Sequence, residues 1–317
     1  MEDDVRRGFS AYPRRSLVLR VLAACTVVVV AVLIKDLVLD SGPTPAKTAG
    51  AKVIDWSVES ELIDEELPVK VVVPPGARDG KRSLLVFLHG RGGNESSSLT
   101  DAMFEGLTAQ GGTAPVVAFP QGGPDAYWHD REEGAWGSYV LEELIPELVT
   151  RFEIEPERIA IGGISMGGFG AFDLARQQPL QLASGESVEF CAVGGHSAAV
   201  WEDGSETAPG AFDDADDFAE HDVISLLGPE QAPLAGSPYW LDVGVDDPFL
   251  EANRAFAVAL DAGGADGKLR EGEGGHEGDY WNARWSQYMR FYSRSLKQCQ
   301  QKAKAATAAA GESDPVS

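Results

Sequence analysis

The sequence contains few cysteines and few histidines. Its 317 residues include three cysteines, Cys25, Cys191 and Cys299, and five histidines. The cysteines have neither the number nor the spacing of a zinc site or of a disulfide framework. Cys191 lies in an apolar run typical of a strand, so we expect it to be a buried free thiol. We predict no metal site and no bound cofactor.

Basic residues are also scarce. The chain has 26 lysines and arginines against 50 aspartates and glutamates, which gives a formal net charge of −24. This excess opposes binding to nucleic acid and to an anionic membrane surface. The acidic residues are best explained as a solubilising surface, and we predict no nucleic-acid partner.

Long apolar runs are rare, and the clearest one lies near the amino terminus. Residues 17–34 are apolar except for Arg20 and Thr26, a length that could cross most of the hydrocarbon core of a bilayer as a helix. Arginines gather at or before its start, which by the positive-inside rule places the amino terminus in the cytoplasm. We predict a cytoplasmic segment (1–15), a single-pass signal anchor (16–38) and a flexible linker (39–52), with the remaining chain outside the membrane.

Two alternatives to an uncleaved anchor stay open. A cleavable signal peptide normally has a shorter apolar stretch followed by a small-residue site, and no good Ala-x-Ala site follows Ile34. The sequence Leu22-Ala-Ala-Cys25 resembles a lipoprotein cleavage site, but cleavage there would leave apolar residues on the mature protein. The alternative locations are therefore a secreted protein or a lipoprotein.

Between residues 53 and 297, segments typical of strands and of helices alternate. This alternation predicts one α/β domain with a mainly parallel central sheet flanked by helices. The tail, 298–317, is polar and rich in alanine, and we expect it to be disordered or a frayed helix end. The predicted strands are 53–58, 69–73, 83–88, 115–119, 158–162, 188–193 and 239–243, and the predicted helices are 138–152, 166–177, 250–262 and 280–296.

The most informative motif is Gly163-Ile-Ser165-Met-Gly167, where an apolar strand-like run stops and a helix of small residues begins. This pattern indicates a nucleophile elbow, a sharp strand-to-helix turn that holds the serine hydroxyl clear of the sheet. We expect glycine at 163 and 167 because a Cβ there would collide with the neighbouring strand and helix. Ser165 is the predicted nucleophile.

A serine nucleophile needs a general base. His276 is favoured because it lies in a glycine-rich loop before the last long helix and gives the chain order serine, acid, histidine. His196, which follows a predicted strand, is its rival. His89 precedes glycines that suggest an oxyanion loop, and His129 and His221 lie in polar stretches where a solvated histidine is expected.

The acid that orients the base is predicted in Leu241-Asp-Val-Gly-Val-Asp-Asp-Pro-Phe249. Asp242 should lie within a strand, whereas Asp246 and Asp247 fall in the turn beyond it. We favour Asp247 and keep Asp246 as the alternative.

The loop after residue 88 and the turn after the nucleophile could stabilise an oxyanion. Two backbone N–H groups usually do so, and we assign them to Met166 and Arg91, with Gly90 as the second choice for the latter. Tyr127, Trp128 and Trp201 are candidates for an acyl or alcohol pocket, although such aromatics are more often part of the core. The acidic segment 201–220 is expected to be a surface loop or a partial lid.

Taken together, these motifs resemble those of the putative esterase family, the α/β-hydrolase group that includes esterase D, feruloyl esterases and mycolyltransferases. The resemblance extends from about residue 67 to residue 296. It implies a triad of Ser165, Asp247 and His276 with an oxyanion hole at Arg91 and Met166, and we assign Gly90, Trp128 and His196 to substrate binding. The motifs are Leu88-His-Gly-Arg-Gly-Gly93, Phe119-Pro-Gln-Gly-Gly123 with Trp128 beyond it, Gly163-Ile-Ser-Met-Gly-Gly168, Gly195-His-Ser197, Gly244-Val-Asp-Asp247 and Gly275-His276.

We expect an outward-facing serine esterase that acts through an acyl-enzyme on a small-molecule, lipid or polysaccharide ester. An acyltransferase that passes the acyl group to a sugar or lipid alcohol is the main alternative. A serine peptidase and an inactive binding protein are further alternatives.

Overall fold

The computed structural model describes residues 45–76, 82–182, 185 and 187–312. The predicted cytoplasmic segment, the signal anchor 16–38 and the first residues of the linker lie outside this range. None of the helices within it combines the length and hydrophobicity that a membrane span requires.

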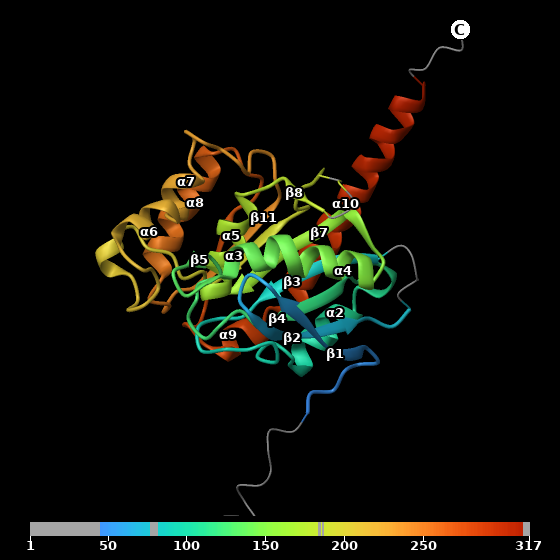
Figure 1. Ribbon diagram of the computed structural model, residues 1–317, viewed down its shortest axis with the longest axis horizontal. Helices are drawn as coiled ribbons and strands as arrows, with labels where there is room; N and C mark the ends of the chain where they lie inside the picture. Colours follow the sequence, from blue (N-terminus) through green and yellow to red (C-terminus); the bar gives the residue numbers. More distant parts are fainter. Residues whose placement is uncertain (1–44, 77–81, 183–184, 186, 313–317) are drawn as a thin grey trace, which may run out of the picture. The chain divides into compact units, whose positions relative to one another are not determined.

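An eight-stranded sheet forms the centre of the described chain (Figure 1). Its order is β1-β2-β4-β3-β7-β10-β11-β12. β2 pairs antiparallel with both β1 and β4, and every other neighbouring pair is parallel, so the predicted mainly parallel sheet is confirmed. The strands are β1 (Lys52–Ser60), β2 (Glu65–Val73), β3 (Arg82–Leu88), β4 (Val116–Pro120), β7 (Ile154–Ile164), β10 (Val193–His196), β11 (Tyr239–Gly244) and β12 (Leu269–Gly272).

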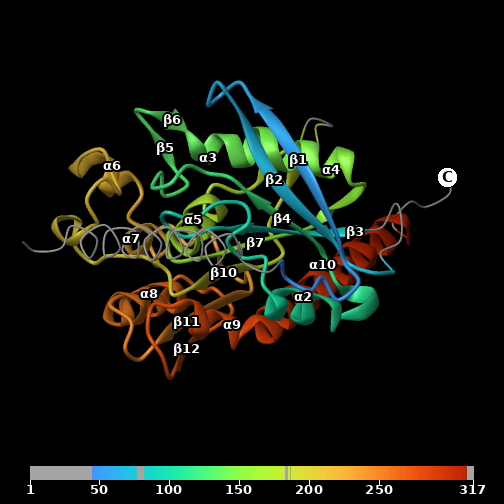
Figure 2. The same cartoon turned by 90° about the horizontal axis from the view of Figure 1, so that it is seen from below.

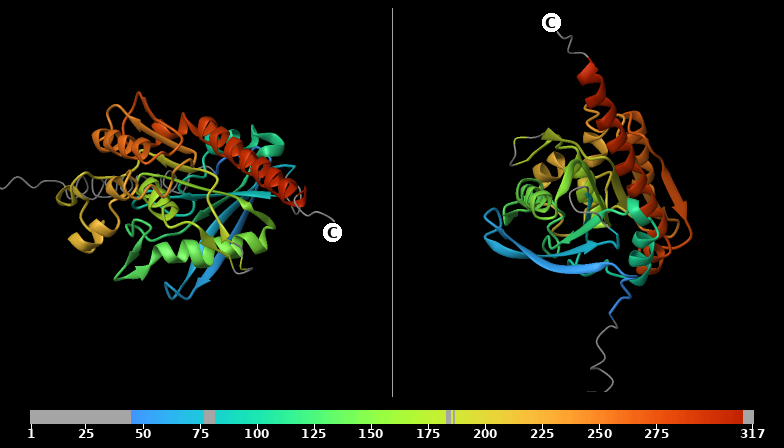
Figure 3. Two further views of the ribbon diagram at one scale, coloured as in Figure 1. Left: turned by 90° about the horizontal axis from the view of Figure 1, so that it is seen from above. Right: turned by 90° about the vertical axis from the view of Figure 1, so that its right-hand side faces the viewer.

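Helices cover both faces of the sheet, which is why its central strands are continuously apolar rather than alternating. In β3 every residue from Ser83 to Leu88 is buried. Figure 3 shows α2 and α10 on one face and α4 and α5 on the other, and Figure 2 shows the β1–β2 hairpin at the sheet edge away from β12. The helix bounds are α2 (Asp101–Thr108), α4 (Ile145–Arg151), α5 (Met166–Ala175), α8 (Leu250–Ala262) and α10 (Trp285–Glu312).

The strand predicted at 188–193 is wrong. Ser187–Val188 is a short strand, β9, that pairs with β8 (Leu180–Gln181) away from the main sheet, and the central strand β10 begins at Val193. A search for apolar runs misses β10 because two of its four residues, Gly194 and Gly195, are glycines. Glycine is needed at 194 because a Cβ there would collide with the Tyr292 hydroxyl of α10.

Two predicted helices differ in extent from those observed. The predicted helix 138–152 begins earlier, with α3 (Trp136–Ser138), and passes through a π-helical stretch, Tyr139–Leu144, before α4. The predicted helix 280–296 is split into α9 (Gly278–Asn282) and α10. Since α10 continues to Glu312, most of the predicted tail is helical, in agreement with the helical alternative rather than with disorder.

Cys191 and Cys299 form a disulfide, so the expectation of a free thiol at Cys191 is wrong. Cys191 lies just before β10 and Cys299 lies on α10, with a Cα–Cα distance of 5.8 Å. The two cysteines are 108 residues apart in sequence, and only the packing of α10 against the sheet brings them together.

Candidate active site

The predicted catalytic side chains follow parallel strands and meet at one edge of the sheet. Ser165 comes directly after β7, Asp247 after β11 and His276 after β12, while the glycine-rich loop 89–93 follows β3. The carboxyl ends of parallel strands point to the same edge, where open α/β sheets place their sites.

Ser165 has the backbone geometry of a nucleophile elbow. Its φ of 57° and ψ of −117° are strained for a residue with a Cβ, a cost of about 1–3 kcal/mol that the surrounding packing must offset. A Cβ at Gly163 would collide with the Gly167 carbonyl, and a Cβ at Gly167 would collide with the Leu88 carbonyl. The predicted steric reason for both glycines is therefore confirmed.

A continuous chain of hydrogen bonds joins Ser165, His276 and Asp247. The serine hydroxyl lies 2.8 Å from His276 Nε2, and His276 Nδ1 lies 3.0 Å from Asp247 Oδ2. With Nδ1–H donating to the carboxylate, Nε2 is free to accept the serine proton. The Asp247 carboxylate is fully buried, whereas the His276 ring is 24% exposed. Solvent therefore reaches the imidazole of His276 but not the carboxylate of Asp247 behind it.

Asp247 and not Asp246 occupies the position behind the histidine. Asp246 is exposed, while Asp247 Oδ1 also accepts the Phe249 N–H at 2.9 Å. Burial opposes ionisation of Asp247, but hydrogen bonds from His276, the Phe249 N–H and the Ser197 hydroxyl lower its pKa below the ordinary value. The carboxylate is therefore charged at neutral pH and can stabilise an imidazolium.

Of the two predicted oxyanion donors, Met166 directly follows the nucleophile and Arg91 lies in the loop after β3. Within the described residues, neither the Arg91 N–H nor the Met166 N–H donates a hydrogen bond. The loop itself is fixed by the Gly92 N–H, which donates to the Pro124 carbonyl at 2.6 Å, and by the Arg91 guanidinium, which donates to the Pro209 carbonyl at 2.7 Å. Two unpaired N–H groups beside a serine can accept a negatively charged oxygen.

Gly90 lies against the nucleophile, but Trp128 does not reach the surface. A Cβ at Gly90 would stand 3.3 Å from the Ser165 Cβ. Trp128 is completely buried, and its Nε1–H donates to the His89 carbonyl at 3.1 Å. The prediction that Trp128 binds substrate is therefore wrong, because its ring supports the loop from beneath. His89 is likewise buried, with its ring 2.9 Å from the Gln121 side chain.

His196 is also buried, and its prediction as a substrate-binding residue and rival base is wrong. Its Nδ1 lies 2.7 Å from Asp242 and its Nε2 lies 3.0 Å from the Tyr292 hydroxyl. Both ring nitrogens are thus used in the core. Its contribution to the elbow is through the backbone, since the His196 carbonyl accepts the Ser165 N–H at 2.9 Å.

Ser197 and Trp281 support the site, and the sequence analysis assigned neither of them a role. Ser197 is buried with a φ of 51°, and its hydroxyl accepts the Trp281 Nε1–H at 3.1 Å. The Trp281 ring packs edge-on against the His276 ring. The Gly195-His-Ser197 motif contained the signal for Ser197, because a polar side chain directly after a buried strand faces the same sheet edge as the nucleophile.

A pocket of about 390 Å³ is separated from His276 by Phe249, and none of the triad residues lines it. Phe249 lines it, and the Phe249 ring centroid is 5.2 Å from that of His276. Trp201 also lines this pocket, whereas Tyr127 is buried in the aromatic cluster behind it. Three carboxylates give the pocket an acidic lining, and they belong to Glu202, Glu206 and Glu251.

The expectation that His129 and His221 are solvated is wrong. His129 is completely buried and His221 is half-buried. Asp217 lies between them, on α6 (Ala215–Glu220), within the acidic segment that was expected to be a surface loop or a lid.

The chain is similar in sequence to known proteins. Residues 60–292 match the family described as "Putative esterase". The chain is 27% identical over 224 residues to S-formylglutathione hydrolase of Paracoccus denitrificans, with 63% of this chain and 77% of that protein covered. It is also 27% identical over 210 residues to acetyl esterase of Caldicellulosiruptor saccharolyticus, with coverages of 62% and 78%.

Among solved structures, the fold is similar to that of FphF, a fluorophosphonate-binding serine hydrolase of Staphylococcus aureus. The TM-score is 0.62 at 17% sequence identity, and the match covers 77% of this chain and 98% of that one. The similarity establishes an α/β-hydrolase-like fold.

Proposed function

The chain belongs to the putative esterase family, and on this basis we propose that it is a serine carboxylic-ester hydrolase with Ser165, His276 and Asp247 as its catalytic triad. The observation that supports this most directly is the unbroken chain of hydrogen bonds from the Ser165 hydroxyl to Asp247 through the two nitrogens of one imidazole.

The proposed reaction has two steps. Ser165 attacks the ester carbonyl while His276 Nε2 takes its proton, and the imidazolium is stabilised by the ionised Asp247. His276 then protonates the departing alkoxide, which leaves an acyl group on Ser165. A water molecule, deprotonated by His276, attacks this acyl-enzyme and releases the acid.

The oxyanion formed in both steps is proposed to accept the N–H groups of Met166 and Arg91. These groups are preorganised, since Met166 begins α5 and the loop around Arg91 is fixed by its own hydrogen bonds. Removing one such donor typically costs about 10²–10³-fold in rate.

Transfer of the acyl group to another alcohol would use the same residues. We favour hydrolysis because the His276 ring is partly exposed, so water can reach the atom that activates it. Product analysis in water with added sugar and lipid alcohols separates the two: transfer products in excess of free acid would overturn the assignment as a hydrolase.

Labelling with a fluorophosphonate probe tests the nucleophile. The wild type should be labelled, Ser165→Ala should not, and His276→Ala should react slowly. Ser205→Ala is the matched control because Ser205 is an exposed serine outside the site, and its labelling should equal that of the wild type. Undiminished labelling of Ser165→Ala would refute the proposed nucleophile.

For location, we propose that residues 16–38 anchor the chain with its catalytic domain outside the membrane. The charge asymmetry around the apolar run supports this orientation. The Cys191–Cys299 disulfide supports it as well, since such bonds persist in oxidising compartments outside the cytoplasm. Protease added to intact cells with an accessible outer face should release the domain by cutting in 41–50, and a fully protected domain would contradict the proposal.

A further inference from the structure

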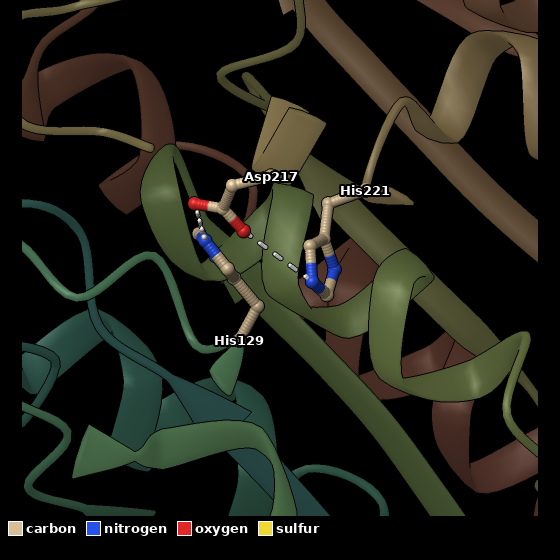
Figure 4. A group of neighbouring side chains, drawn as sticks. All are labelled: His129, Asp217 and His221. Carbon is tan, nitrogen blue, oxygen red and sulfur yellow. Dashed lines mark hydrogen bonds and ion pairs between the residues drawn. The ribbon is translucent and has the colours of Figure 1, made fainter. Parts of the chain in front are cut away.

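His129, Asp217 and His221 form a compact cluster that includes none of the proposed triad residues (Figure 4). His129 precedes the short strand β5 (Asp130–Arg131), while Asp217 lies on α6 and His221 follows its last turn. One nitrogen of each histidine and a carboxylate oxygen all lie within 4.8 Å of one another. The cluster therefore joins two segments that are almost ninety residues apart in sequence.

The distances suit a single small cation. Asp217 Oδ2 lies 3.2 Å from His129 Nε2, and Asp217 Oδ1 lies 3.7 Å from His221 Nε2. Two ligand atoms that each stand about 2.1 Å from a tetrahedral zinc ion are roughly 3.4 Å apart. The two separations, which end on different oxygens of Asp217, lie on either side of this value, and one ligand atom from each of the three residues falls within 4.8 Å of the others.

A second carboxylate orients His221. Asp173 is completely buried, and its Oδ2 lies 2.9 Å from His221 Nδ1. With Nδ1–H donating to Asp173, the lone pair of Nε2 faces Asp217. A carboxylate behind a histidine is the usual support of a metal-binding imidazole, because it fixes the tautomer and raises the basicity of the ligand nitrogen.

His129 Nε2 faces Asp217. Its Nδ1 is buried and has no hydrogen-bond partner among the described residues, so its polar contact in the fold is with Asp217. In this hydrogen bond Nε2 donates its proton to the carboxylate, so binding of a cation by Nε2 requires that proton to move to Nδ1 or to be released.

Two arginines lie nearby, but each has its own carboxylate. Arg131 Nε is 3.8 Å from Asp217 Oδ2, and its guanidinium pairs with Asp213 at 2.5 Å. Arg176 is 3.3 Å from His221 Nδ1 and pairs with Asp173 at 2.8 Å. With these two pairs balanced, Asp217 supplies the remaining negative charge.

From this geometry we propose that His129, Asp217 and His221 bind one divalent cation of the zinc type. Two imidazoles and one carboxylate suit Zn²⁺ and leave a fourth position for water. The ion would fasten α6 to the chain beside Trp128, which supports the loop carrying Arg91. The site thus departs from the sequence prediction of no metal, and it does not depend on the ester chemistry of Ser165.

Zinc titration of the full-length chain, after treatment with a chelator, tests the site. Isothermal titration calorimetry should give one equivalent bound to the wild type, and Co²⁺ in place of zinc should give visible absorption bands of a low-coordinate site. Asp217→Asn and His221→Gln should each weaken binding by at least about tenfold. Asp216→Asn is the matched control, because Asp216 is exposed on the same helix, and it should bind like the wild type.

His276 and Asp247 are another histidine and carboxylate that zinc could contact. His276→Ala should retain the one equivalent if the ion binds at His129, Asp217 and His221. Loss of binding in His276→Ala, equal binding in Asp217→Asn and the wild type, or no binding to a folded wild type would each overturn the proposal. Circular dichroism of every variant confirms that it is folded before titration.

Discussion

His196 and Asp242 form a histidine–aspartate pair, 2.7 Å apart and buried in the core, that is separate from the one next to Ser165. Asp242 also accepts the Tyr288 hydroxyl at 2.8 Å and the Trp240 Nε1–H at 2.7 Å. The Tyr288 ring stacks on His196. The pair thereby connects α10 to strands β10 and β11, whose ends position Ser197 and Asp247.

Replacing His196 should affect stability more than chemistry. Removing one partner of a buried hydrogen bond leaves the other unsatisfied and costs about 1–3 kcal/mol, so His196→Gln should lower the free energy of unfolding by at least that amount. Folded His196→Gln should still react with a fluorophosphonate, whereas His276→Gln should be stable and nearly unreactive. Urea unfolding and labelling per folded molecule measure the two effects. Equal stability of His196→Gln and the wild type would show that the pair has no structural role.

The two adjacent aspartates should differ sharply in kinetics. Asp247→Asn removes the carboxylate that fixes the His276 tautomer, and kcat should fall by about 10³–10⁴-fold. Asp246→Asn changes an exposed side chain and should leave kcat within about twofold. Steady-state rates with a short-chain chromogenic ester are the measurement, and the reverse ranking would move the acid by one residue.

The pH dependence of stability should report on the ionisation of Asp247. The pKa of Asp247 in the folded chain lies below its ordinary value of 3.8. Its ionised form therefore adds stability above that pH, and this contribution is lost as the pH falls through the folded-state pKa. Urea midpoints should be measured between about pH 6 and pH 2.5. The midpoint of the wild type should fall relative to that of Asp247→Asn as the solution becomes acidic. A difference that stays constant across this range would contradict the direction of the shift.

Three glycine-to-alanine changes separate folding from catalysis. Gly167→Ala places a Cβ into the Leu88 carbonyl and should destabilise the fold by more than about 4 kcal/mol. Gly90→Ala brings a Cβ to 3.3 Å from the Ser165 Cβ, which should shift the loop slightly and lower kcat by roughly tenfold with little loss of stability. Gly112→Ala is the control, because nothing lies within 4 Å of its added Cβ. Wild-type kcat in Gly90→Ala would show that the loop position is not critical.

Local sequence was sufficient to predict the elbow and the order of its partners. Gly163, Gly167 and Ser165 act through contacts within a few residues or with the adjacent strand, and a fixed motif records such contacts. The apolar runs likewise predicted β3 and β11, because strands buried on both faces are usually rich in apolar residues.

Features that depend on distant packing could not be predicted in the same way. Trp128 and His196 have the residue types of a binding site, but helices and loops from elsewhere in the chain bury them. The Cys191–Cys299 bond requires the path of α10, and the approach of His129 to Asp217 requires the fold of the acidic segment. Sequence spacing contains no information on either.

The acidic pocket beside His276 should discriminate against anionic substrates. Of its three carboxylates, that of Glu251 shares Arg254 with Glu271, while Glu202 and Glu206 have no ion pair within the described residues, so the pocket keeps a negative charge. Repulsion of about 1 kcal/mol between two nearby charges in water corresponds to roughly fivefold in kcat/KM. An ester with a carboxylate in its alcohol part should therefore react about fivefold more slowly than a neutral ester of the same size.

The ratio of kcat/KM for the neutral ester to kcat/KM for the carboxylate ester should decrease in 0.5 M salt, because salt screens exposed charges. It should also decrease in Glu206→Gln. Glu105→Gln changes the net charge of the chain by the same amount at an exposed position on α2, outside the residues that line the pocket, and should leave the ratio unchanged. If Glu105→Gln and Glu206→Gln change the ratio equally, the slower reaction of the anionic ester results from the net charge of −24 and not from the pocket lining. A ratio near one in the wild type at low salt would show that the alcohol part of the substrate does not enter this pocket.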